Sequence, residues 1–161
     1  MLQTTAIAVG IPMFREIATE IEIDGSAQGV WDVLADFAAY PRWNPFLLKV
    51  DGTPKAGERI RFRFELPRGF RAPACATVLK ADPGMELRWA GSLPGLFRAE
   101  HYFVIERIGT ARLRFRHGEI FSGLLVPIVW PILRGNAREV YVAMNVALKE
   151  RVERGAADAS V

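Results

Sequence analysis

Hydrophobic and polar residues alternate along segment 14–24, where three isoleucines are interleaved with glutamate and aspartate side chains. A period of two residues is typical of a strand that buries one face and exposes the other. Segments 58–66 and 110–122 alternate in the same way, each with arginine at three alternate positions. We therefore predict three strands that turn a charged face to solvent.

Proline and glycine divide the middle of the chain into further short segments of this kind. We predict six successive strands after the first, at 46–51, 58–66, 70–81, 85–91, 96–108 and 110–122. Their connections are short, and short connections join antiparallel neighbours. The prediction is one antiparallel sheet with one exposed and one covered face.

Two parts of the chain change to helical spacing. Ser26 can cap a helix, and the apolar residues from Val30 to Phe37 follow at that spacing. The prolines of segment 40–45 end this region, with a short second helical turn there. Apolar residues of segment 129–152 also recur at helical spacing, which predicts a long C-terminal helix, kinked or preceded by a separate turn near prolines 127 and 131.

This order of elements defines an α+β fold in which the last helix packs across the covered face of the sheet. A strongly curved sheet leaves a concavity that one helix does not fill, so the covered face should line a cavity as well as a core. We assign residues 14–153 to this ligand-binding domain, residues 1–13 to an N-terminal extension and residues 154–161 to a flexible tail.

Length and composition favour a single core, since the chain has 161 residues of which 50% are hydrophobic. The net charge is +3, but acidic and basic residues are interleaved, so we expect no nucleic-acid partner. We call the alternate arginines of segments 58–66 and 110–122 the arginine rows; they are Arg59, Arg61, Arg63, Arg112, Arg114 and Arg116. These rows should form the solvated outer face of the sheet, paired with glutamates across strands, and not a phosphate or membrane site.

The chain has a single cysteine, Cys75, which rules out an internal disulfide. We expect a buried, inert thiol and a cytoplasmic location. Segment 1–14 lacks the positive region of a signal peptide. The apolar segment 124–133 is far shorter than the roughly 20 residues that span a bilayer, so we expect no stable membrane insertion.

Three ionisable side chains should lie inside the sheet. Strand alternation places His101 on the inner face of one strand, and His117 and Glu119 on the inner face of the next. Such groups among aromatic residues can act as general bases, or they can form hydrogen bonds that hold one strand to the next. They could also be metal ligands, but neither histidine lies in a metal-binding motif, so we expect no metal and no cofactor.

The predicted cavity wall is mainly aromatic, and these aromatic side chains could equally belong to the core. Gly91 is included because a glycine on an inner face would leave space for a ligand. The predicted ligand-binding residues are Trp43, Phe46, Phe62, Phe64, Trp89, Gly91, His101, Phe103, Phe115, His117, Glu119, Phe121 and Met144. Segments 93–97 and 123–130 are apolar for loops, so they form either a mobile mouth or a homodimer contact.

Several motifs occur together in the order found in one superfamily: segments 30–34, 36–45, 87–91, 101–103, 119–123 and 144–151. With them the chain resembles the START-like (SRPBCC, polyketide cyclase/dehydrase-like) superfamily. The resemblance implies the helix-grip fold, a curved antiparallel β-sheet wrapped around a long C-terminal α-helix, with two short helices after the first strand.

The resemblance also implies three classes of function. The first is binding of a small hydrophobic ligand, such as a lipid, fatty acyl or polyketide-like compound, in an internal cavity. The second is a cyclase or dehydratase in which Glu119 or His101 is the general base and the other donates a hydrogen bond. The third is a protein partner similar to the chaperone-ATPase activators. The sequence does not decide whether the protein is an enzyme, and it does not identify the ligand.

Overall fold

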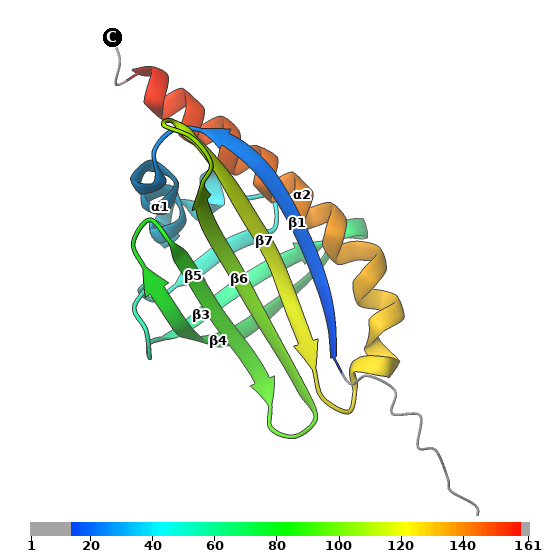
Figure 1. Cartoon of the computed structure of the whole chain (residues 1–161). Helices are drawn as coiled ribbons and strands as arrows, with labels where there is room; N and C mark the ends of the chain where they lie inside the picture. Colours follow the sequence, from blue (N-terminus) through cyan, green and yellow to red (C-terminus); the bar gives the residue numbers. More distant parts are fainter. Residues whose placement is uncertain (1–13, 159–161) are drawn as a thin grey trace, which may run out of the picture.

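A curled antiparallel sheet wraps around one long helix in this protein (Figure 1). The structure is a computed structural model that describes residues 14–158. Within these residues the strand order is β1-β7-β6-β5-β4-β3-β2. The strands are β1 Phe14–Asp24, β2 Leu47–Asp51, β3 Arg59–Leu66, β4 Phe70–Asp82, β5 Glu86–Leu93, β6 Phe97–Arg107 and β7 Arg112–Ser122. The helices are α1 Ala27–Ala35, η1 Phe37–Arg42, η2 Pro67–Gly69 and α2 Val126–Asp158.

These elements confirm the predicted α+β helix-grip fold. All seven predicted strands form, and each end lies within two residues of its predicted position. The first strand pairs with the last one along its whole length, from Phe14 opposite Ser122 to Asp24 opposite Arg112. This pairing places β1 beside β7, where α2 also packs against it (Figure 1).

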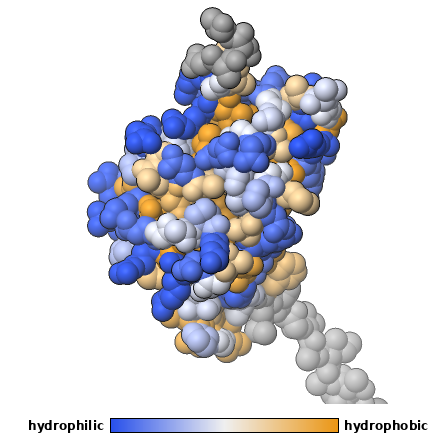
Figure 2. Space-filling view, turned by 90° about the vertical axis from the view of Figure 1, so that its left-hand side faces the viewer, coloured by the Kyte–Doolittle hydropathy of each residue, from blue (hydrophilic) through white to orange (hydrophobic). Residues whose placement is uncertain are grey.

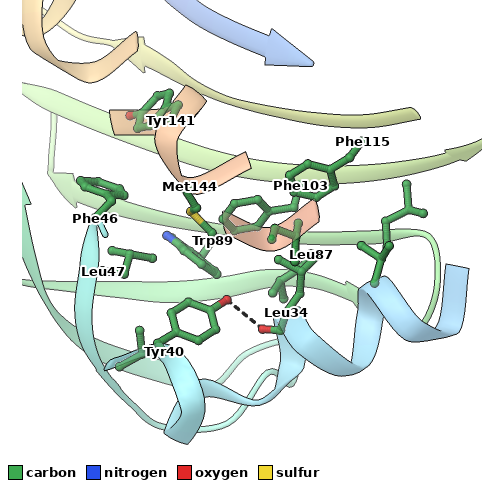
Figure 3. Close-up of a cluster of buried hydrophobic side chains, with 14 of the residues drawn as sticks. Leu34, Tyr40, Phe46, Leu47, Leu87, Trp89, Phe103, Phe115, Tyr141 and Met144 are labelled. Atoms are coloured by element: carbon green, nitrogen blue, oxygen red, sulfur yellow. Dashed lines mark hydrogen bonds between the residues drawn. The ribbon is translucent and has the colours of Figure 1, made fainter. Parts of the chain in front are cut away.

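Local signals fix the first helical region as expected. The Ser26 hydroxyl oxygen accepts a hydrogen bond from the Gly29 backbone N–H over 3.0 Å, which caps α1. The Tyr40 hydroxyl donates to the carbonyl oxygen of Leu34 over 2.8 Å and so ties η1 to the end of α1 (Figure 3). Burial raises the pKa of Tyr40, which therefore remains a neutral phenol.

The C-terminal helix is continuous. Pro127 and Pro131 both lie inside α2, so the separate turn that the sequence allowed does not form. Pro127 is tolerated because the N–H groups of a first helical turn have no intrahelical partner. The helix runs to Asp158, into the segment assigned to a tail. The predicted extension at 1–13 and tail residues 159–161 lie outside the described residues.

The inner face of the sheet is buried unevenly. Beneath α1 and the second half of α2, side chains such as Leu87, Phe103 and Phe115 are fully buried (Figure 3). On β3, Phe62 and Phe64 point to the same face but are only half-buried. The interior is therefore sealed at one end and incompletely covered along β3.

The outer face carries the arginine rows, as predicted. Arg112 pairs with Glu22 at 2.8 Å, and Arg116 pairs with Glu106 at 3.4 Å. Figure 2, which views the side of α1, shows hydrophilic and hydrophobic residues intermixed. None of the helices in residues 14–158 combines the length and apolarity needed to cross a bilayer.

Candidate functional site

Two histidines form the centre of a polar cluster inside the sheet. His101 lies on β6 and His117 on β7, and both are buried, as the alternation predicts. Their Nε2 atoms are 2.8 Å apart, which is a hydrogen-bond distance. The Trp89 ring stacks on His101 at 5.4 Å between ring centroids, and Phe46 stacks on it at 6.2 Å. The pair is therefore enclosed by aromatic side chains.

Thr19 on β1 sets the direction of the hydrogen bonds. Its hydroxyl donates to the carbonyl oxygen of His117 over 2.9 Å, so its oxygen accepts from Asn145 Nδ2, also over 2.9 Å. The amide oxygen of Asn145 then faces His117 Nδ1 at 2.7 Å. Because an amide oxygen only accepts, Nδ1 of His117 carries the proton.

The tautomer of His101 follows from that of His117. Burial, and secondly the neighbouring His101, hold the pKa of His117 well below its usual value, so His117 is neutral. Its unprotonated Nε2 accepts from Nε2–H of His101. The remaining nitrogen, His101 Nδ1, then carries no proton and is an acceptor.

Glu119 and Tyr141 complete the cluster at its exposed end. His101 Nδ1 lies 3.7 Å from a carboxylate oxygen of Glu119, whose side chain is 18% exposed. The Tyr141 hydroxyl of α2 donates a short hydrogen bond to the other oxygen. Burial, together with the negative charge of Glu119, raises the pKa of Tyr141 well above its usual value, so it remains a donor.

The cluster links the sheet to the long helix. From one end to the other it runs through Glu119, His101, His117, Asn145 and Thr19. A proton taken up at His101 Nδ1 would be stabilised by the adjacent carboxylate. The arrangement can therefore act as a general base with a carboxylate at its exposed end, and Tyr141 can act as a hydrogen-bond donor.

The aromatic residues predicted to line a cavity pack largely against one another. Phe46, Trp89, Phe103, Phe115, Phe121 and Met144 are buried, whereas Trp43, Phe62 and Phe64 are half-buried. Phe46 contacts Phe64, at 6.1 Å between ring centroids. It also contacts Tyr141, at 5.6 Å (Figure 3). The expected hollow beside the histidines is filled by these side chains in this structure.

Among the hollows in the described residues, two open at the surface. One, of about 260 Å³, is lined by the turn from β5 to β6 and by the connection from β7 to α2. The other, of about 150 Å³, lies over the outer face of β2, β3 and β4. His101, His117 and Glu119 line neither of them.

The larger hollow lies between the apolar loop segments 93–97 and 123–130. The N–H of Leu125 donates to the carbonyl oxygen of Leu96 over 3.0 Å and holds the segments together. Leu93, Leu124 and Ile128 are exposed around this end of the molecule. A role as a mouth or as a homodimer contact remains a prediction.

Gly91 and Cys75 differ from their predicted roles. A Cβ atom at Gly91 would lie 2.8 Å from the carbonyl oxygen of Cys75, so glycine is required by the close approach of β4 and not by a ligand. Cys75 itself is exposed, not buried. Its side chain alternates with the buried Ala76 and so points to the outer face of β4.

Sequence reasoning missed the contributions of Thr19, Tyr141 and Asn145. Tyr141 and Asn145 are four residues apart and so share one face of a helix, which was a usable signal. Thr19 is the polar residue in the alternating inward positions of β1, where Ile17, Ile21 and Ile23 are isoleucines. No three His, Cys, Asp or Glu side chains within residues 14–158 come together in a way that could hold a metal ion.

The helix-grip fold and the family match place the protein among START-like proteins. The chain belongs to the polyketide cyclase/dehydrase and lipid transport family, which matches residues 15–153. No curated protein sequence matches the chain.

Solved structures share its fold at low sequence identity. An aromatase/cyclase, Zhui, from Streptomyces sp. R1128 is 17% identical with a TM-score of 0.72, over 88% of this chain and 94% of that one. A START superfamily protein from Mycobacterium smegmatis is 21% identical with a TM-score of 0.66, over 86% and 97%. Norcoclaurine synthase from Thalictrum flavum is 16% identical with a TM-score of 0.66, over 88% and 96%.

Proposed function

We propose that the protein binds a small hydrophobic molecule, such as a lipid, fatty acyl or polyketide-like compound, between the inner face of the sheet and the first half of α2. The observation that carries this proposal is the uneven covering of the inner face. Phe62, Phe64 and Leu66 of β3 are half-buried although they point toward the interior. An apolar ligand would complete their burial.

The opposite wall is also incompletely packed. Trp130 and Leu133 of α2 pack against the core but are only half-buried. None of the described side chains between positions 127 and 136 is fully buried, whereas Tyr141, Met144 and Leu148 are. Displacing segment 127–136 would therefore sacrifice little buried area, and a ligand could enter without unfolding the core.

Leu133→Arg tests this binding mode. The substitution places a charge on the inward face of α2, so affinity for an apolar probe such as 1-anilinonaphthalene-8-sulfonate should fall about tenfold or more, which we would measure by fluorescence titration. Ile128→Arg is the matched control, because Ile128 lies on the same segment but is 71% exposed.

Equal affinity in both variants would contradict the proposed location. Native mass spectrometry of protein purified from cells, followed by solvent extraction, should also recover a retained apolar compound. A protein that retains none and binds no apolar probe does not have this function.

The polar cluster favours a second candidate, a cyclase or dehydratase. Glu119 or His101 would remove a proton from carbon next to a ligand carbonyl, and Tyr141 is placed to donate a hydrogen bond to the resulting oxyanion. The contact of His101 Nδ1 with Glu119 and the bond from Tyr141 to the same carboxylate support this candidate. The protein-partner alternative rests on the family resemblance alone.

Glu119→Gln separates catalysis from binding. The amide keeps the size of the side chain but cannot accept a proton, so turnover of a polyketide-like substrate should fall by about 100-fold or more while affinity changes little. Product formation by mass spectrometry and affinity by titration are the two measurements. Unchanged turnover would remove Glu119 from the reaction.

We also propose a cytoplasmic location and no nucleic-acid partner. The single cysteine supports the first part. The interleaving of acidic and basic residues supports the second, because a nucleic acid is usually bound by a continuous basic surface.

A further inference from the structure

Two neighbouring residues carry buried hydrogen-bond donors that the protein does not satisfy. Trp43 Nε1 and Asn44 Nδ2 are both buried, and neither has a hydrogen-bond partner in residues 14–158. Asn44 is only 4% exposed. Because a buried donor without an acceptor is costly, such groups are rare in a folded protein and usually have a specific reason.

The orientation of the Asn44 amide is fixed by its other atom. Its Oδ1 accepts hydrogen bonds from the backbone N–H groups of Phe46, at 2.9 Å, and Leu47, at 2.8 Å. The nitrogen therefore cannot be exchanged with the oxygen, and Nδ2 is a donor. The indole nitrogen of Trp43 is also only a donor. Both positions thus require an acceptor.

The two donors lie where the chain enters the aromatic cluster. The Trp43 ring packs edge-on against Tyr40 at 5.1 Å between centroids. Phe46, two residues after Asn44, contacts His101 and Tyr141 of the polar cluster. The other buried polar side chains of the interior, which are Thr19, His101, His117 and Asn145, all have partners. Residues 43 and 44 are therefore distinct from the rest of the interior.

We propose that Trp43 Nε1–H and Asn44 Nδ2–H donate hydrogen bonds to an oxygen atom of the bound molecule. The donors are uncharged and cannot neutralise a buried anion, whose desolvation is costly, so they suit a carbonyl or hydroxyl oxygen. The ligand class is then an oxygenated aromatic or polyketide-like compound, and not a plain hydrocarbon chain. This inference rests on the proposed function, since it assumes that an apolar molecule occupies the space beside β3.

A matched pair of probes tests the inference. 2-Acetylnaphthalene and 2-ethylnaphthalene have similar shapes, but only the first carries a carbonyl oxygen. The wild-type protein should bind the acetyl compound roughly fivefold more tightly, as one net hydrogen bond would give. The acetyl compound alone should move the indole N–H resonance of Trp43, which Trp43→Phe identifies among the signals of the four tryptophans.

Two variants remove the donors with little structural change. Trp43→Phe keeps an aromatic ring, and Asn44→Asp keeps an oxygen that accepts from Phe46 and Leu47. Each variant should bind the acetyl compound only about one to two times as tightly as the ethyl compound. Trp31→Phe, on α1, is the control and should leave the preference unchanged.

The outcomes separate this inference from the proposed function. If both probes bind and the preference is the same in wild type and variants, with no shift of the Trp43 signal, the donor role is wrong and apolar binding stands. If neither probe binds to the wild-type protein, the proposed function fails for aromatic ligands and the inference fails with it.

Discussion

His117 is a neutral histidine held in one tautomer by its neighbours. Asn145 accepts the proton of Nδ1, and His101 donates to Nε2. If Nε2 of His117 were protonated, its N–H would point at the Nε2–H of His101, so two donors would face each other. The stability of the protein should therefore depend on pH through this residue.

We expect the free energy of unfolding to decrease as pH falls below about 6.5, the usual pKa of histidine. In the folded protein the pKa of His117 lies well below that value, so the unfolded chain binds a proton that the folded chain does not. The stability that His117 confers is therefore complete above pH 6.5 and is lost toward lower pH, by at most about 1.4 kcal/mol per pH unit. Urea unfolding between pH 5.5 and 7.5 measures this slope.

His117→Gln provides the control for that experiment, because glutamine does not titrate. The free energy of unfolding of this variant should change less with pH over the same range. The carboxyl groups with lowered pKa, Glu86, Glu100 and Glu153, titrate below this range and do not interfere. Equal slopes in wild type and variant would contradict the assignment of His117.

For single residues, the alternation of apolar and polar positions along the strands predicted that His101, His117 and Glu119 face inward. It could not predict their partners, because Tyr141 and Asn145 come from a helix whose position over the sheet depends on tertiary packing. The exposure of Cys75 was predicted wrongly, because the apolar composition of its strand does not show which of the two faces is covered. The polar Thr19 was missed for a similar reason, since it lies among isoleucines.

The long helix has two parts with different packing. From Tyr141 to Val152, every third or fourth side chain is buried, whereas the segment 127–136 contributes only half-buried side chains to the core. Pro131 also removes one backbone hydrogen bond from the first part. The first part should therefore open more readily than the second.

Hydrogen exchange measures this difference. Amides of segment 128–136 should exchange at least tenfold faster than those of segment 141–152, because local opening exposes less apolar surface there. An apolar ligand bound at the proposed location should slow the exchange of the first segment selectively. If the amides of both segments were equally protected from exchange, the first part of α2 would not open separately from the second.

The extent of this helix shows the limit of prediction for a single element. Helical spacing predicted its second half, where burial follows the pattern closely. Pro127 and Pro131 left the start open, since proline is compatible with a first helical turn but also with a separate turn. In the structure the helix begins directly after Leu125, whose N–H is bonded to Leu96 in the turn between β5 and β6.

On the scale of the molecule, one hydrophobic cluster joins the sheet to both α1 and α2. Ile23 of β1, Leu34 of α1 and Leu148 of α2 are all fully buried in it. We therefore expect a single cooperative unfolding transition. Far-ultraviolet circular dichroism and tryptophan fluorescence should give coincident urea curves. Two separated transitions would show that part of the sheet unfolds independently of the helix.

The order of elements was sufficient to predict this architecture, because a run of short strands followed by one amphipathic helix has few ways to bury its apolar faces. The filling of the interior was not predictable. Whether Phe46 and Tyr141 pack against each other or leave a hollow depends on how far the sheet curls, and the alternation pattern carries no information about curvature.

The pairing of β1 with β7 has a consequence for biosynthesis. The hydroxyl of Thr19 bonds to a carbonyl 98 positions further along the chain. β1 therefore gains no neighbouring strand until β7, the last strand of the sheet in chain order, has been made, and its isoleucines remain uncovered until then. A nascent chain that stalls before β7 is made would present this edge to other chains, so slow translation should favour its capture by chaperones.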